Sequence, residues 1–199
     1  MSGETILSIV TGIALSAACG FRVFVPMLVL SIASYTGEIA LPSSLEWLRS
    51  LVGQVHLASG FEWVGTPIAL KAFLIATLCE IAAYYIPWFD HLLDHVTSPA
   101  AILAGVFIMA SSVTGLSPFL RWVLAIIAGG ATAGAVQGIT VGTRAGSTAA
   151  SLGTTNWIVA TVEWIGSLLL SLLALVLPAI ILITLGAILI FSSRRKTPR

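Results

Sequence analysis

The sequence predicts an all-α, polytopic membrane protein with about six transmembrane helices in two inverted three-helix repeats. Composition, long apolar runs and a repeated order of motifs support this class. Of the 199 residues, 58% are hydrophobic and 9% are charged, whereas soluble domains carry about 25% charged residues. The formal net charge of +1 provides no basic field for nucleic acid. The composition therefore excludes a soluble enzyme, a nucleic-acid binder and a disordered chain, and it predicts one transmembrane domain over residues 1–199.

Apolar runs of bilayer length define the expected crossings. The first, residues 5–34, contains Gly20 and Pro26 and is predicted to kink or break near them. The next three are residues 67–88, 99–114 and 117–143. The last run, 156–191, would be about 54 Å long as one helix. We therefore expect two crossings that meet at Pro178, with one strongly bent helix as the alternative.

The flanking segments predict the orientation. Residues 35–66 form a hydrophilic insert, in which Ser43 and Glu46 fit a capping box that starts an interfacial helix. Residues 143–156, rich in small and hydroxyl side chains, are expected to form a loop. The last run is followed by a basic tail, and positive flanks stay in the cytoplasm. Six crossings would then place both termini in the cytoplasm of a bacterial plasma (inner) membrane and the insert outside. The tail residues are Arg194, Arg195, Lys196 and Arg199.

Three motifs follow the same order in both halves of the chain. A stripe of small residues, an acid after an Ala-Thr pair and a Pro-Ala segment each occur twice. The first set is Gly12, Ser16, Gly20, Glu80 and Pro99; the second is Gly130, Gly134, Gly138, Glu163 and Pro178. Units of three spans, about 1–115 and 116–199, would be inverted relative to each other, as in many secondary transporters. Chance recurrence of small residues in an apolar chain is the alternative.

Small residues and prolines within the spans also predict close helix packing or hinges. Packing is the commoner role of such stripes. Unwound backbone beside a ligand is the functional alternative at Gly20 and Gly138. The predicted packing or hinge residues are Gly20, Pro26, Gly130, Gly134, Gly138 and Pro178.

Charged and polar side chains inside the runs predict the site. A carboxylate at a helix centre costs about 2.5–3.5 kcal/mol on insertion scales, so Glu80 and Glu163 are expected to face a shared polar site. Arg22 is their expected counter-charge or an anion ligand, and Gln137 a further polar group. A buried Arg22–Glu pair that only fixes helix packing is the alternative.

Residues 88–95 form a second constellation, in which Asp90 and Asp94 lie one helical turn apart, as do His91 and His95. The aspartates would attract ions at a mouth, whereas an amphipathic turn at the membrane surface explains the same pattern. Whether a metal binds stays open. No phosphate loop, zinc spacing or hydrolase motif occurs in the sequence, so we expect neither a cofactor nor an enzyme.

The chain resembles an uncharacterised bacterial family of multi-span integral membrane proteins, catalogued only as a domain of unknown function. The likeness lies in residues 19–26 (CGFRVFVP), the Glu80 span that ends in Tyr-Ile-Pro-Trp, the acids Asp90 and Asp94, and residues 99–101 (PAA). It implies a multi-span fold and brings no substrate, and His91 and His95 are not carried over from it.

The sequence thus favours a small transporter or channel for an ion or small polar solute. A non-transporting membrane scaffold that binds a partner or lipid is the main alternative, and an enzyme acting on lipid ranks third. The expected partners are the lipid bilayer and the solute, with a homodimer left open and no nucleic acid.

Overall fold

A computed structural model describes residues 2–38, 56–85 and 89–195, with the backbone alone for 37–38, 89–94 and 177–195. All regular structure in these ranges is helical, and five helices are long and apolar enough to cross a membrane. The all-α, multi-pass class is therefore confirmed. The elements are α1 (Gly3–Phe21), α2 (Phe24–Glu38), the short helix η2 (Glu62–Gly65), α4 (Pro67–Tyr84), α5 (Phe89–Ser112), α6 (Pro118–Leu124), the π-helical segment η3 (Ala125–Gly130), α7 (Ala131–Ser151) and α8 (Asn156–Arg195).

Hydroxyl side chains fix where several helices start. The Thr66 hydroxyl accepts a hydrogen bond from the Ala69 N–H at 3.3 Å, directly before Pro67 opens α4. Ser117 and Pro118 begin α6 in the same way. A side-chain cap satisfies an N–H that the helix leaves unpaired, and proline at the first position has none to satisfy.

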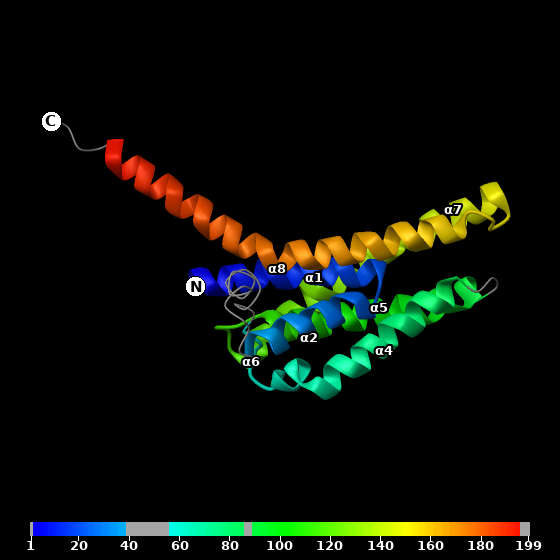
Figure 1. The fold of residues 1–199 in the computed structure, drawn as a ribbon, viewed down its shortest axis with the longest axis horizontal. Coiled ribbons are helices and arrows are strands. Elements are labelled where there is room, and N and C mark those ends of the chain that lie inside the picture. The colour runs from blue at the N-terminus through cyan, green and yellow to red at the C-terminus, as the bar shows by residue number, and fades with distance from the viewer. Residues whose placement is uncertain (1, 39–55, 86–88, 196–199) are drawn as a thin grey trace.

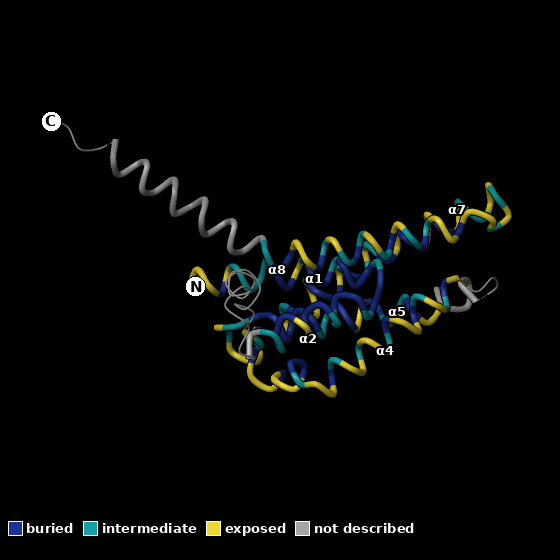
Figure 2. The backbone as a smooth tube through the Cα atoms, in the orientation of Figure 1, coloured by how far each residue is buried: buried dark blue, intermediate teal, exposed yellow. Residues whose placement is uncertain are grey.

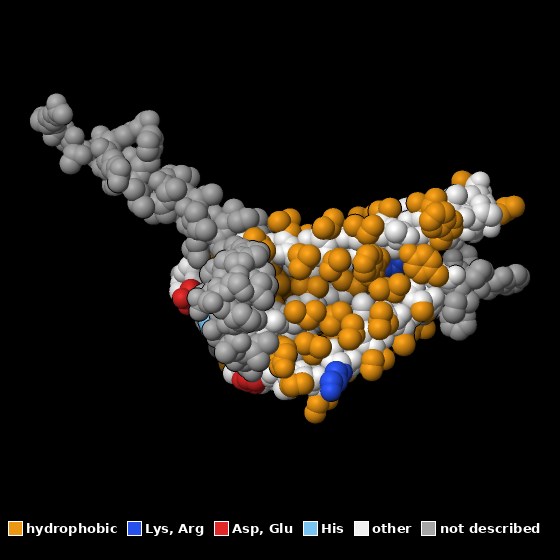
Figure 3. Space-filling view, viewed as in Figure 1, with side chains coloured by type: hydrophobic (Ala, Val, Ile, Leu, Met, Phe, Trp, Pro, Cys, Tyr) orange, Lys and Arg blue, Asp and Glu red, His pale blue; other side chains and the backbone are white. Residues whose placement is uncertain are grey.

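Successive long helices run antiparallel, and α1 lies at the centre of the bundle (Figure 1). It packs against α5, α7 and α8, whereas α2 packs against α4 and α8. The burial colours follow this order, with α1 and α2 largely buried and the outer helices exposed along one side (Figure 2). On the face shown in Figure 3, hydrophobic side chains are spread over the described helices and charged side chains are few, as expected next to a bilayer.

The first apolar run forms a helical hairpin rather than one kinked crossing. Helix α1 ends at Phe21, Arg22 adopts an extended conformation (φ −147°, ψ 131°), and α2 returns toward the N-terminal end (Figure 1). The break near Gly20 and Pro26 was predicted correctly, but the reversal was not. The insert therefore leaves α2 on the same side as the N-terminus, and its predicted position across the membrane from that end is wrong. The predicted capping box at Ser43 and Glu46 lies outside the described residues.

The last apolar run is one helix rather than two crossings. Helix α8 continues through Pro178 and bends between its orange and red parts in Figure 1, so the bent single helix is the alternative that holds. Proline removes one backbone hydrogen bond, which bends a helix without always ending it. The loop expected over 143–156 is also shorter, because α7 continues to Ser151 and ends at Leu152, whose φ is 53°.

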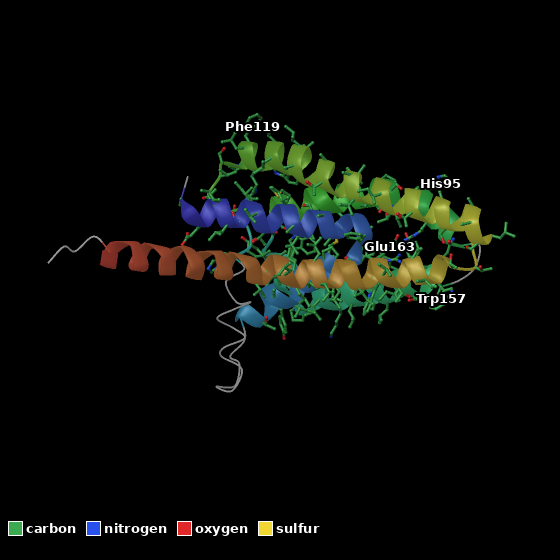
Figure 4. All side chains as sticks on the ribbon, turned by 90° about the horizontal axis from the view of Figure 1, so that it is seen from above. His95, Phe119, Trp157 and Glu163 are labelled. Carbon is green, nitrogen blue, oxygen red and sulfur yellow. The ribbon has the colours of Figure 1, made fainter. Side chains whose placement is uncertain are left out.

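These boundaries do not place three described helices on each side of residue 116, as the predicted pair of inverted three-helix repeats requires. Helices α1, α2, α4 and α5 precede residue 116, and the α6–η3–α7 rod and α8 follow it. Helices α1 and α7, which the repeated glycine stripe would match, run in the same direction in Figures 1 and 4, whereas inversion requires opposite directions. Gly20 abuts the α7 backbone, but no atom in the part of the chain that the structure describes lies within 4 Å of a Cβ built on Gly138. The common pattern thus marks similar composition rather than equivalent positions.

Aromatic side chains gather where the insert returns to the bundle. The Phe61 ring lies 5.4 Å from that of Phe107 and 6.1 Å from that of Trp122, with the Arg121 guanidinium 5.6 Å from its centre. Beside it, backbone N–H groups of Glu62 itself and of Gly60 hydrogen-bond to the Glu62 carboxylate and lower the pKa of that side chain. This cluster has the composition of a membrane-interface anchor.

Candidate functional site: a buried charge cluster

The reversal between α1 and α2 places Arg22 inside the bundle. At 1.5 Å per residue, its neighbour Glu80 lies about 6 Å from the end of α4, and Glu163 about 10 Å from the start of α8. The hairpin therefore turns back before these helices end. Beyond this turn the α4–α5 pair and the α7–α8 pair diverge (Figure 1).

Glu163 joins two arginines from different helices. Arg22 Nη2 lies 3.2 Å from Glu163 Oε2, and Arg144 Nε donates to Glu163 Oε1 at 3.1 Å. Arg144 Nη2 also bonds to Oε2. Figure 4 shows Glu163 on the side of α8 that faces α7, while Trp157 points away from the bundle. One carboxylate thus links the α1–α2 turn, α7 and α8.

An aromatic ring from α4 completes this contact. The Cζ atoms of Arg22 and Arg144 lie 3.7 Å and 4.1 Å from the centre of the Tyr84 ring. The Tyr84 hydroxyl is 3.1 Å from Thr97 Oγ1 on α5. Guanidinium groups stack favourably on aromatic faces, most strongly where water is excluded. Tyr84 therefore holds both cations in place without neutralising them.

Glu80 has a different role, because it caps the start of α2. Its Oε1 accepts from the Val23 N–H at 2.8 Å, and its Oε2 accepts from the Phe24 N–H at 3.0 Å. These N–H groups have no partner within the helix. A carboxylate also complements the positive end of the helix dipole. Glu80 thereby allows a helix to begin within an apolar bundle.

The cluster is almost fully removed from the surface of the protein. Arg22, Arg144 and Glu163 are 2%, 3% and 4% exposed. Four charges at about 2.5–3.5 kcal/mol each would oppose insertion by about 10–14 kcal/mol if they were unpaired. Their mutual contacts offset this cost, and removing one partner of such a pair typically costs 3–5 kcal/mol.

Arg22 keeps unused donors even here. Its Nη2 donates to the Ala160 carbonyl at 2.9 Å and contacts Glu163. Its Nε and Nη1, which together carry three N–H bonds, are buried and have no hydrogen-bond partner among the described residues. A buried charged donor without an acceptor is unfavourable, so this side of the cluster suits an added acceptor.

The predicted site residues have different outcomes. Glu80, Glu163 and Arg22 do come together around one cluster, although each acid has its own partners. Gln137 is buried too, but its Nε2 hydrogen-bonds to Ser98 Oγ at 3.4 Å rather than to the charged cluster. The side chains of Asp90 and Asp94 lie outside the description, as does that of His91, and no group of three His, Cys, Asp or Glu side chains that could hold a metal occurs in the part searched.

The predicted packing residues divide into two groups. Gly20 lies against α7, and Cβ atoms built on Gly130 and Gly134 would lie 3.1 Å and 3.2 Å from Val106 and Ile102 of α5. Pro26 lies in the first turn of α2 and is fully buried. A Cβ built on Gly138 would have no atom of the described residues within 4 Å, and Pro178 lies within α8.

Sequence reasoning missed Arg144 and Tyr84. Arg144 falls in the segment expected to form a loop, yet it follows Gln137 and Thr140 at intervals of seven and four, on one face of a helix. Tyr84 likewise follows Glu80 by four residues. This spacing of polar residues could have predicted that Arg144 and Tyr84 face the cluster. For Arg144 the prediction also requires α7 to continue beyond residue 143.

An all-helical bundle with apolar flanks and a charge cluster in its interior defines a multi-pass membrane protein. A family model matches residues 9–53 and 50–195, so the chain belongs to that family, described as Domain of unknown function (DUF4126). The resemblance predicted from the sequence is thereby confirmed. No curated protein and no solved structure matches the chain.

Proposed function

We propose that the protein is a small membrane transporter or channel for an ion or small polar solute, with the cluster of Arg22, Arg144, Glu163 and Glu80 as its polar site. The observation that carries the proposal is a helix break within the bundle that is lined with buried charges. Ionisable groups at such depth often mark ion or solute pathways. Transporters form their sites from discontinuous helices whose N-termini point at the ligand.

The proposed orientation uses the basic C-terminal tail. Both described chain ends lie at the same end of the bundle (Figure 1), and the positive-inside rule favours the cytoplasm for that end. In a bacterial plasma membrane, the cluster would then lie nearer the outer surface, about 10 Å below the ends of α7 and α8. A homodimer is compatible with this arrangement.

Flux across liposomes tests the proposal. The purified full chain is reconstituted, and the flux of cations, anions and protons is measured against empty vesicles. Glu163→Gln and Glu80→Gln are expected to lower flux about tenfold or more. Cys79→Ala and Val162→Ala, next to the acids in sequence but with exposed side chains, serve as matched controls. Flux no higher than in empty vesicles, or equal in all variants, would contradict transport.

A scaffold is the second candidate, because Glu163 is bonded to Arg22 and Arg144 and so ties three parts of the bundle together. In that case the protein binds a partner or lipid and moves nothing. The same Glu→Gln changes would then lower stability or assembly, and the wild-type vesicles would show no flux.

A further inference from the structure

We infer that Arg22 is the binding residue for a small anion that presents carboxylate- or phosphate-type oxygens at the turn between α1 and α2. Naming this anion as the transported solute rests on the proposed function. Binding of the anion does not, and it is measured separately.

The first argument concerns the donors of Arg22. The side chain is 2% exposed, with Cζ 3.7 Å from the Tyr84 ring centre and Nη2 donating to the Ala160 carbonyl. These contacts fix the orientation of the side chain. The N–H bonds of Nε and Nη1 have no partner in the ranges that the structure describes. An oxyanion is the acceptor that a guanidinium binds most strongly.

The second argument concerns the backbone next to Arg22. The following two N–H groups, of Val23 and Phe24, already bind the two oxygens of the Glu80 carboxylate. The turn thus recognises a carboxylate from within the chain. Because α2 begins there, the helix dipole also favours negative charge at this position.

The third argument concerns competition. Glu163 lies 3.2 Å from Arg22 and also bonds to Arg144 through both of its oxygens. An incoming anion would therefore share Arg22 with Glu163 and be repelled by its charge. Neutralising Glu163 removes this repulsion and leaves the positive charges of Arg22 and Arg144 uncompensated, which favours binding of an anion.

Equilibrium binding of acetate and of phosphate to the purified full chain tests the inference, with thermal stability as a second readout. Wild-type protein is expected to bind one of them saturably. Arg22→Gln should weaken that binding about tenfold or more, the effect of losing one charge-assisted hydrogen bond. Arg22→Lys, which keeps the charge and lacks the Nε and Nη1 donors, should weaken it too. Glu163→Gln should bind more tightly and gain more thermal stability from the anion than wild type does.

Two results would overturn the inference. One is an absence of saturable binding in both wild type and Glu163→Gln. The other is equal affinity in wild type, Arg22→Lys and Arg22→Gln, with Cys79→Ala as the control for unrelated change. Cation flux that depends on Glu163 without anion binding would leave transport standing and end this inference. Anion binding without flux of any solute would support this inference and contradict the proposed transport.

Discussion

At the scale of single residues, two buried glutamates are stabilised inside an apolar bundle by two different kinds of partner. Glu163 is held by guanidinium groups, and Glu80 by backbone N–H groups. The same residue type thus has two different roles, and substitutions should separate them.

Substitution of Glu80 should expose its capping role. Glu80→Gln keeps one oxygen acceptor and should lower the free energy of unfolding by about 1.5–3 kcal/mol, the value of a hydrogen bond to a charged group. Glu80→Leu should cost more, because the Val23 and Phe24 N–H groups would both be left buried without an acceptor. Unfolding in mixed detergent micelles measures both, with Cys79→Ala expected near zero. A Glu80→Leu protein as stable as wild type would refute the cap.

Tyr84 allows its ring to be separated from its hydroxyl. Tyr84→Phe keeps the ring and removes the hydroxyl, with its contact to Thr97 and its hydrogen bond to the Arg144 side chain, so a loss of about 1.5 kcal/mol is expected. Tyr84→Leu removes the surface on which two guanidinium groups stack, and the loss should approach about 3 kcal/mol because cavity and cation–π terms add. Thermal unfolding of the two variants, measured side by side, separates the contribution of the ring from that of the hydroxyl. Equal losses would mean that the stacking contributes nothing.

At the scale of elements, the closest helix contacts depend on glycine at particular positions. A Cβ on Gly20 would lie 2.6 Å from the Ala133 carbonyl oxygen of α7 and 2.9 Å from the Gln137 backbone nitrogen. Neither neighbour is the end of a flexible side chain, so the helices must separate. Small residues allow this kind of approach in membrane bundles, where packing replaces the hydrophobic effect between helices.

Alanine at two glycines of the predicted stripes tests this contact. Gly20→Ala should cost about 1–3 kcal/mol through overpacking against α7. Gly138→Ala should be neutral or stabilising by up to about 1 kcal/mol, because alanine favours a helix and no described residue has an atom within 4 Å of the new methyl group. Unfolding free energies and α1–α7 cross-linking provide the measurements. The opposite order of effects would disprove the packing described here.

At the scale of the whole molecule, the hairpin changes which segments share a side of the membrane. The N-terminus, the end of α2, the 56–66 segment and the loop before α6 all lie at one end of the bundle (Figure 1). The Thr154 turn lies at the other. A single kinked crossing would instead separate the N-terminus from the insert.

Cysteine accessibility distinguishes these topologies. In a Cys19→Ala/Cys79→Ala background, Ser2→Cys and Ser59→Cys should react with a membrane-impermeant maleimide from the same side of oriented vesicles. Thr154→Cys should react from the other side, and intact and permeabilised vesicles give the comparison. Reaction of Ser2→Cys and Ser59→Cys from opposite sides would contradict the hairpin.

The sequence alone determined the membrane class, the positions of most apolar segments, the break near Gly20 and the grouping of Glu80, Glu163 and Arg22 inside the bundle. These follow from local properties, because hydrophobicity, helix breakers and buried charge are readable from neighbouring residues. Only the tertiary structure decided that the chain reverses at Arg22, that α8 continues through Pro178, and that Arg144 and Tyr84 join the cluster. Each of these outcomes depends on a partner far away in the chain: the reversal requires the Glu80 carboxylate from α4, and the cluster requires the α1–α2 turn to meet α4, α7 and α8. A pattern read along one segment cannot supply such a partner.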